Sequence, residues 1–276
     1  MQQHSFVLTK KFSLSCLVVL GSCLSSSAAL LADFDGGGVP YTEGSVKTAA
    51  VNAGQVVAGG PSGSYYHLLD GDEGGAGNYV SVASAGSTAN WVSATFTMDF
   101  RADRIQADGF SVGFLDTATH GATDVVRAGT TRLNEAEERG HYSNSIGVGF
   151  RTFNGTNAKV NYNGVEGSDA GYTLTATEWG SIEIQLDRDL ATGDVLLDAT
   201  VFSGTGQSGT AGNVFTDFAI PGVTMEEFRM QIAGRTGGAA MDLDIDNLNL
   251  SVTIPEPATS LLAGLSLLAL GARRRR

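Results

Sequence analysis

Three aspartates recur at every second position in the segment Asp242-Leu243-Asp244-Ile245-Asp246. In an extended strand this spacing places the three carboxylates on one face, because successive side chains point to opposite sides of a sheet. Clustered carboxylates are the oxygen ligands that Ca²⁺ takes in proteins. The alternative is the solvated face of a closing strand, which needs no ligand. Structural calcium therefore stays open, and the sequence indicates no other cofactor.

The same carboxylates resemble, in outline only, the Glu-x-Asp-x-Glu strand of retaining glucanases. Such an enzyme needs an acid and a nucleophile about 5 to 5.5 Å apart. Aspartate is one methylene shorter than glutamate, so the reach of both groups is reduced. We therefore expect no catalysis, and a glycoside hydrolase remains a distant alternative.

The other residues with acid–base or metal-binding chemistry are scattered. His67, His120 and His141 show none of the short spacings that place two histidines on one metal ion, so surface loops are expected for them. The segment Glu135-Ala136-Glu137-Glu138-Arg139 is expected to be a solvated acidic turn.

Alternating apolar and polar residues identify the elements that must position these groups. This period of two is typical of half-buried antiparallel strands, and two facing sheets would bury their apolar sides. We predict an all-β, antiparallel two-sheet sandwich of the jelly-roll type over residues 30–253. Near Asp246-Asn247 the alternation changes phase, which predicts a β-bulge. The six clearest segments are residues 91–101, 110–114, 146–150, 182–186, 195–201 and 228–232.

Three of these segments, together with a hairpin over residues 179–198, resemble L-type lectins of the concanavalin A-like superfamily. Residues 107–115 open with Ala107-Asp108-Gly109 and end in Phe114-Leu115, as one lectin strand does. Residues 148–154 follow the lectin metal strand, and residues 228–238 are similar to the penultimate strand with its Thr-Gly loop. The resemblance implies the same sandwich fold and a carbohydrate-binding module.

The lectin resemblance also implies candidate site residues. Asp108 corresponds to the sugar-binding aspartate, and Gly237-Gly238 would let backbone amides approach the same ligand. The metal-binding glutamate and aspartate of the lectin strand are replaced here by Gly149 and Arg151, so no lectin-type metal pair is expected. Arg151 either orients Asp108 in place of the metal or points outward into solvent, and the sequence leaves both possibilities open.

The C-terminus has three parts in order: Pro255-Glu256-Pro257, a small and apolar run over residues 258–272, and a basic end. This order resembles the PEP-CTERM sorting signal, over residues 254–276, which a membrane protease called exosortase reads in Gram-negative bacteria. The apolar run would form a short transmembrane helix of about 22 Å at about 1.5 Å per residue. The alternative is a tail anchor that stays attached. The basic end consists of Arg273, Arg274, Arg275 and Arg276.

The N-terminus resembles a secretory signal peptide. Lys10-Lys11 precede the apolar residues 12–20, and Ser27-Ala28-Ala29 suits signal peptidase, so residues 1–29 are predicted to be removed. An alternative is the lipobox-like Leu20-Gly21-Ser22-Cys23, which would leave Cys23 acylated at the N-terminus. Cys16 and Cys23 are the two cysteines of the chain, so no disulfide is expected in the exported domain.

Charge narrows the choice of partners. Removing both signals takes away six of the 17 basic residues, so the exported domain carries a net charge near −18. Such a domain repels nucleic acid and anionic lipid.

The expected partners are signal peptidase, exosortase and an extracellular polysaccharide. The expected location is the cell surface, outer envelope or extracellular matrix, after transient anchoring in the inner membrane. A structural or adhesive surface protein without a sugar site is the alternative.

Overall fold

A computed structural model of the 276-residue chain describes most of the region between the two predicted signals. All described residues belong to one compact unit, Leu24–Pro257. The described residues are 24–36, 40–45, 54–72, 75, 77–83, 88–106, 108–126, 138–153, 156–163, 165–167, 170–172, 174 and 177–255.

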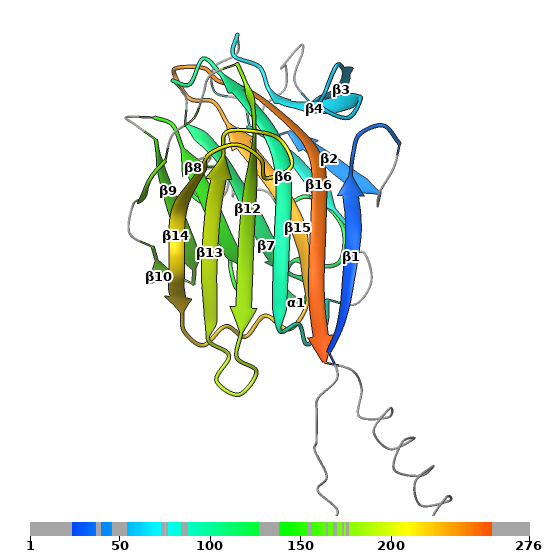
Figure 1. Ribbon diagram of the computed structural model, residues 1–276, viewed down its shortest axis with the longest axis vertical. Coiled ribbons are helices and arrows are strands. Elements are labelled where there is room, and N and C mark those ends of the chain that lie inside the picture. The colour runs from blue at the N-terminus through cyan, green and yellow to red at the C-terminus, as the bar shows by residue number, and fades with distance from the viewer. Residues whose placement is uncertain are drawn as a thin grey trace, which may run out of the picture. The chain divides into compact units, whose positions relative to one another are not determined.

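Two antiparallel sheets face each other and form a sandwich, which confirms the predicted fold class (Figure 1). Sheet A has the strand order β14-β13-β12-β6-β16-β4-β3, with β1 also paired to β16. Sheet B has the order β10-β9-β8-β7-β15-β5-β2, with β11 paired to β9. All six segments with clear alternation lie in strands, except that residues 91–92 precede their strand.

The strands of sheet A are β1 (Leu24–Ala32), β3 (Gln55–Ala58), β4 (Ser64–Leu69), β6 (Ser93–Asp103), β12 (Trp179–Arg188), β13 (Val195–Phe202), β14 (Ala211–Ile220) and β16 (Asp242–Pro255). Those of sheet B are β2 (Tyr41–Ser45), β5 (Gly77–Val82), β7 (Gly109–Asp116), β8 (Ile146–Arg151), β9 (Asn157–Tyr162), β10 (Val165–Glu166), β11 (Ala170–Gly171) and β15 (Phe228–Arg235). A single helical turn, α1 (Thr117–His120), follows β7.

Aromatic side chains join the two sheets across the core. The ring of Phe96 on sheet A meets that of Phe114 on sheet B edge-on, with ring centroids 6.4 Å apart. Phe228 contacts both Phe114 and Trp91, again edge-on, at 5.4 and 5.6 Å. Edge-to-face pairs of this kind add about 0.5–1.5 kcal/mol each to the burial of apolar area. The sandwich therefore provides rigid strand ends on which loops can present polar groups.

The predicted bulge is present in β16. The pairing of β16 with β6 loses its register between Asp246 and Asn249. Asn247 adopts a φ of 50°, in the left-handed region, which is typical of the extra residue that a bulge accommodates. The bulge turns the second half of β16 so that Leu248 and Leu250 take the core side.

Strand β1 bears on the predicted N-terminal processing. It pairs with β16 from Leu24 opposite Pro255 to Ala32 opposite Leu248. Cleavage after Ala29 would remove six of its nine residues and leave the facing edge of β16 without that partner. The rest of the predicted signal peptide, Cys23 of the lipobox-like segment, and the C-terminal residues from Glu256 onward lie outside the described residues.

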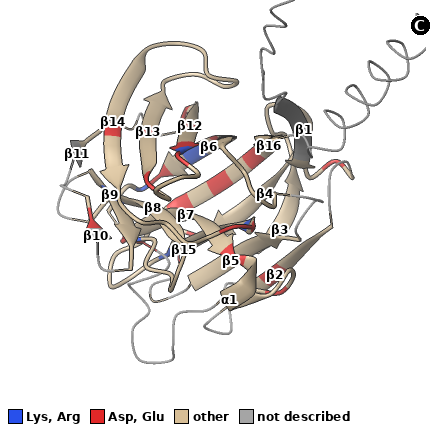
Figure 2. Ribbon diagram, turned by 90° about the horizontal axis from the view of Figure 1, so that it is seen from below, with Lys and Arg blue, Asp and Glu red and all other residues tan. Residues whose placement is uncertain are grey.

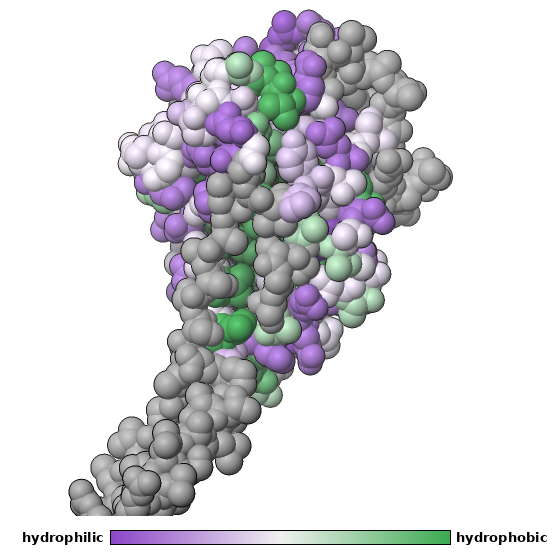
Figure 3. All heavy atoms as spheres, turned by 90° about the vertical axis from the view of Figure 1, so that its right-hand side faces the viewer, coloured by the Kyte–Doolittle hydropathy of each residue, from purple (hydrophilic) through white to green (hydrophobic). Residues whose placement is uncertain are grey.

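Exposed apolar side chains are few and dispersed. In the described part of the chain the large ones are Val56 on β3, Phe153 after β8, Leu190 between β12 and β13, and Leu196 on β13. Figure 3 shows hydrophobic residues interspersed with hydrophilic ones on one face of the molecule. Among the described residues, no helix has the length and apolar character needed to cross a membrane.

Candidate functional site

Asp108 lies immediately before β7, at an end of sheet B where three neighbouring strands meet. Its neighbour Gly109 is paired with Arg151 at the end of β8 on one side and with Arg235 at the end of β15 on the other. Residues paired across antiparallel strands project from the same face of a sheet. The register therefore places two arginines from distant parts of the sequence on either side of Gly109, the residue that follows Asp108.

An ion-pair cluster forms at this junction. Arg235 Nη1 lies 3.0 Å from Asp108 Oδ2 and 3.9 Å from Glu138 Oε2. The other oxygen of Glu138 lies 3.9 Å from Arg151 Nε and 3.4 Å from Arg139 Nε. Two carboxylates thus share three guanidinium groups, and we call Asp108, Glu138, Arg139, Arg151 and Arg235 the Asp108 cluster.

The position of Arg151 differs from both alternatives that the sequence left open. Its side chain is only 19% exposed and faces Glu138, so it is not an outward, solvated residue. Among the described residues it is Arg235, and not Arg151, that forms an ion pair with Asp108. The role predicted for Arg151, holding Asp108 by a fixed positive charge, is therefore taken in the structure by Arg235.

Burial dominates the electrostatics of both acids in the cluster. Desolvation raises the pKa of Asp108 above its ordinary value, and the charges of Arg235 and Arg151 only partly oppose this. Desolvation also raises the pKa of Glu138, the charge of Asp108 adds to the rise, and the three arginines oppose it. The ionised carboxylates of Asp108 and Glu138 are thus less favourable here than in water. Raised carboxyl pKa values of this kind are common at ligand-binding and catalytic sites.

Several polar atoms of the cluster are buried without a hydrogen-bond partner. Within the described part of the chain they are Arg151 Nε, Arg235 Nε and Asp108 Oδ2, the last of which is ion-paired without hydrogen-bond geometry. Buried polar groups in proteins are nearly always hydrogen-bonded, and exceptions call for a water or ligand. Asp108 Oδ2 is nevertheless ion-paired with Arg235 Nη1 at 3.0 Å, so the donors of the cluster left without a hydrogen bond are the two Nε atoms.

The loop after β15, whose glycines were predicted to approach the same ligand as Asp108, lies against Asp108. A Cβ atom built on Gly237 would lie 2.4 Å from Asp108 Oδ2, so only glycine permits this approach. A Cβ atom on Gly238 would meet nothing within 4 Å. The structure thus brings Asp108 and Gly237 together, whereas Gly238 borders open space.

Glu138 corrects one prediction. The acidic segment was expected to be solvated, but Glu138 is only 3% exposed, while Glu135 and Glu137 lie outside the described residues. A Cβ atom on Gly149 would lie 2.4 Å from the carbonyl oxygen of Glu138 and 2.6 Å from Arg139 Cα. The backbone of residues 138–139 thus occupies the space that a side chain would need at the position of the lectin metal-binding glutamate.

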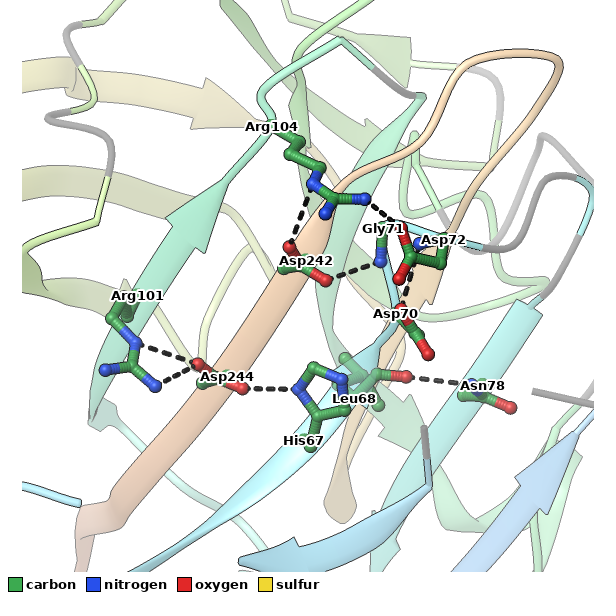
Figure 4. Close-up of polar contacts among 10 residues, drawn as sticks. All are labelled: His67, Leu68, Asp70, Gly71, Asp72, Asn78, Arg101, Arg104, Asp242 and Asp244. Carbon is green, nitrogen blue, oxygen red and sulfur yellow. Dashed lines mark hydrogen bonds and ion pairs between the residues drawn. The ribbon is translucent and has the colours of Figure 1, made fainter. Parts of the chain in front are cut away.

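The three aspartates of β16 have different partners, and Figure 4 shows those of Asp242 and Asp244. Asp242 accepts a hydrogen bond from the backbone amide of Gly71, and Asp246 accepts one from Ser62 Oγ at 3.1 Å. Asp244 accepts hydrogen bonds from Arg101 Nε at 2.8 Å and, at 2.6 Å, from His67 Nδ1. Figure 2 shows acidic residues recurring along β16. Their carboxylates do not share one cation position, because each is engaged by a different neighbour.

His67 lies within strand β4 rather than in the surface loop that was expected. Burial lowers its pKa, but the hydrogen bond and charge of Asp244, with smaller contributions from Asp242 and Asp70, outweigh burial and leave the pKa raised. Sequence spacing gave no sign of this contact, since His67 and Asp244 are 177 positions apart.

A serine motif on β7 offers no nucleophile. Gly109-Phe110-Ser111-Val112-Gly113 has the Gly-x-Ser-x-Gly spacing of a hydrolase elbow. Ser111 is fully buried in the middle of the strand, and its hydroxyl lies 3.3 Å from the hydroxyl of Tyr142. An elbow requires an exposed serine on a sharp turn, so this motif is a part of the sheet.

Comparison with known protein families confirms the C-terminal signal. The family model described as the PEP-CTERM protein-sorting motif matches residues 253–276. No curated protein sequence matches the chain.

Solved structures similar to this one are L-type and legume lectins. Arcelin-5, a lectin-like defense protein from Phaseolus vulgaris, is 10% identical with a TM-score of 0.51, and 83% of this chain and 98% of that one are covered. The winged bean acidic lectin complexed with methyl-α-D-galactose is 12% identical with a TM-score of 0.52, covering 84% and 100%. The metal-free exoplasmic domain of VIP36 is 10% identical with a TM-score of 0.52, covering 83% and 92%. At this identity the likeness establishes the lectin-like sandwich fold alone.

Proposed function

We propose that this protein is an exported, non-catalytic carbohydrate-binding module whose ligand contacts Asp108. The observation that carries the proposal is the Asp108 carboxylate paired with Arg235 at 3.0 Å, together with the Nε atoms of Arg151 and Arg235, which are buried and have no hydrogen-bond partner within the described structure. They lie at strand ends of a lectin-like sandwich. Rigid strand ends that carry convergent polar groups are a common setting for small-ligand sites.

The chemistry of the cluster suits a neutral saccharide. Sugar hydroxyls donate hydrogen bonds, and a carboxylate accepts them with roughly twice the strength of a neutral acceptor. The guanidinium Nε atoms donate to hydroxyl oxygens, and the open space in this loop lies at Gly238, where a Cβ atom would meet nothing within 4 Å. Arg235 supplies positive charge next to Asp108, so this presentation of the aspartate requires no lectin-type metal pair at Gly149 and Arg151.

A structural or adhesive role without a sugar site is the second candidate. Its specific support is the segment of residues 138–139, which packs against Gly149 and partly neutralises the arginines through Glu138. In that case the cluster would only lock this segment onto sheet B. The two functions differ in whether Asp108 changes ligand binding or only stability.

Exchange of Asp108 for asparagine separates these functions, because it keeps the shape of the side chain but removes its charge. We expect Asp108→Asn to weaken saccharide binding by about 1.5 to 3 kcal/mol, the contribution of hydrogen bonds to a charged group. Because the exchange also removes one partner of the buried pair with Arg235, stability falls as well, and binding is therefore compared per folded molecule. A glycan array that includes methyl-α-D-galactoside and mannosides would identify the ligand, and titration calorimetry with the best saccharide would measure the loss.

The matched control is Asp187→Asn, an exposed aspartate on β12 of the other sheet, which should bind as the parent does. A parent protein that binds no glycan on the array would exclude the carbohydrate-binding function. Unchanged binding by Asp108→Asn, with reduced stability, would assign Asp108 to the structural role.

The sorting motif implies export and processing at a membrane. We propose that exosortase removes the tail, so that the mature protein ends near Pro255-Glu256-Pro257 and is released to the cell surface or the extracellular matrix. Intact-mass analysis of the surface or secreted protein should then show a chain without Arg273, Arg274, Arg275 and Arg276. A surface form that still carries the four arginines would contradict this processing.

The same mass spectrum locates the N-terminus. Cleavage after Ala29 predicts a chain that begins at Leu30, whereas processing at the lipobox-like segment predicts an acylated Cys23. Only the second form keeps all of strand β1, whose first residue is Leu24.

A further inference from the structure

Three side chains with metal-binding atoms meet where β4 ends and β16 begins. His67, Asp70 and Asp242 each offer one ligand atom, and these atoms all lie within 4.8 Å of one another. Figure 4 shows the imidazole and the two carboxylates on neighbouring backbone segments. The site is separate from the Asp108 cluster, and none of its three residues belongs to that cluster.

The strand register explains why these residues meet. Strand β4 pairs with β16 so that Leu69 lies opposite Leu243 and His67 lies opposite Asp244. Asp70 directly follows β4, and Asp242 is the first residue of β16. Antiparallel pairing thus places the residue after one strand beside the first residue of the other.

His67 is held in an orientation that suits a metal ligand. Its Nδ1 lies 2.6 Å from Asp244 Oδ1, and a carboxylate can only accept, so Nδ1 carries the proton. Asp244 is itself fixed by Arg101, through Nε at 2.8 Å and Nη2 at 2.7 Å. Metal-binding histidines usually donate their second ring nitrogen to a carboxylate in this way, which leaves Nε2 available as the ligand.

Asp70 provides independent evidence for a missing partner. The residue is only 7% exposed, and Asp72 donates its backbone amide to Asp70 Oδ1 at 2.9 Å. The second oxygen, Oδ2, is buried and has no hydrogen-bond partner within the described structure. A buried carboxylate oxygen without a donor is costly, and a cation would satisfy it.

We propose that His67, Asp70 and Asp242 bind a divalent first-row transition metal. One imidazole nitrogen with two carboxylate oxygens favours such an ion over Ca²⁺, which takes oxygen ligands. Zn²⁺ binds these groups in tetrahedral sites and can keep a fourth position for water. The three ligands match that set, with Asp244 and Arg101 as the supporting groups behind His67.

The nearby Arg104 does not occupy the site. Its Nε lies 3.9 Å from Asp242 Oδ2, beyond hydrogen-bond distance, and its guanidinium pairs with the exposed Asp72. The side chain of Arg104 is 52% exposed and extends from the surface. Arg104 therefore balances the negative charge of Asp72 and Asp242 at the edge of the proposed metal site, and its side chain is free to move when a cation binds.

Titration with Zn²⁺ tests the proposal. The exported protein, produced without a histidine tag, is stripped with chelator, dialysed and titrated by calorimetry. We expect one Zn²⁺ per chain. His67→Gln and Asp70→Asn should each weaken binding about 100-fold or more, and Asp244→Asn should weaken it about 10- to 100-fold because it loosens the imidazole. His120→Gln, a histidine on α1 outside the site, should bind as the parent does.

Two further measurements make the result independent of variant folding. Circular dichroism shows which variants fold, and nitrogen NMR of the parent protein, labelled at histidine, shows whether Zn²⁺ shifts the Nε2 resonance of one histidine. Absence of Zn²⁺ binding, or binding with no Nε2 shift, would overturn the proposal and leave His67 as a protonated partner of Asp244. The proposal would also be overturned if the parent bound Ca²⁺ as tightly as Zn²⁺ and His67→Gln left the Ca²⁺ affinity unchanged.

Discussion

Gly149→Glu is expected to destabilise the domain by at least about 4 kcal/mol, because there is no space for any side chain at this position. A Cβ atom would lie 2.4 Å from the carbonyl oxygen of Glu138 and 2.6 Å from Arg139 Cα. The new glutamate would also place a second carboxylate beside Glu138. The pKa of Glu138 is already raised by burial. The substitution restores the lectin residue but would displace the segment that covers it here.

Equilibrium unfolding in urea measures this loss as a decrease in the free energy of unfolding. Gly149→Ala should cost about 2 to 3 kcal/mol, since the methyl group alone overlaps the same backbone. Gly238→Ala is the matched control, because a Cβ atom there meets nothing within 4 Å. It should change stability by less than about 0.5 kcal/mol. A Gly149→Glu variant as stable as the parent would show that residues 138–139 do not pack on Gly149.

Arg235→Gln is expected to cost about 2 to 4 kcal/mol at neutral pH, because it leaves a largely buried Asp108 without its nearest counter-charge. Removing one partner of a buried pair is far more costly than removing both. The double variant Asp108→Asn/Arg235→Gln should therefore recover most of the lost stability. Arg104→Gln is the control, since its exposed pair with Asp72 should contribute less than about 1 kcal/mol.

The loss in Arg235→Gln should depend on pH in a defined direction. The pKa of Asp108 is already raised above its ordinary 3.8, and removal of Arg235 raises it further. The folded state then binds a proton more tightly than the unfolded state, so the associated stability is present at low pH and is lost as pH rises through the folded pKa. The deficit of Arg235→Gln relative to the parent should shrink as pH falls from neutrality toward 4. A deficit that does not change with pH would show that Asp108 is not the group left unpaired.

Local patterns predicted the sheets and the signals. Alternation identified strands because side-chain direction in a strand is set by the backbone itself, and the phase change at Asp246-Asn247 identified the bulge for the same reason. The C-terminal order of Pro-Glu-Pro, apolar run and arginines is contiguous, and a single family model recognises it. The lectin resemblance predicted that Gly237-Gly238 and Asp108 approach one ligand, and in the structure Gly237 lies beside Asp108.

The partners of charged residues could not be predicted in this way. Arg235, not Arg151, holds Asp108, and the choice depends on which side chain at either side of Gly109 reaches the carboxylate. Glu138 is buried because its backbone crosses Gly149, a contact that no local pattern records.

The amino-acid sequence by itself determined that the chain is an exported β-sandwich with a C-terminal sorting motif, since these properties arise from neighbouring residues. Only the tertiary structure decided which polar groups meet. Strand register joins Asp108 to Arg235, and it joins His67 to Asp244 across 177 positions. Register depends on the packing of both sheets at once, so a contact between distant strands is a property of the whole fold and not of any segment.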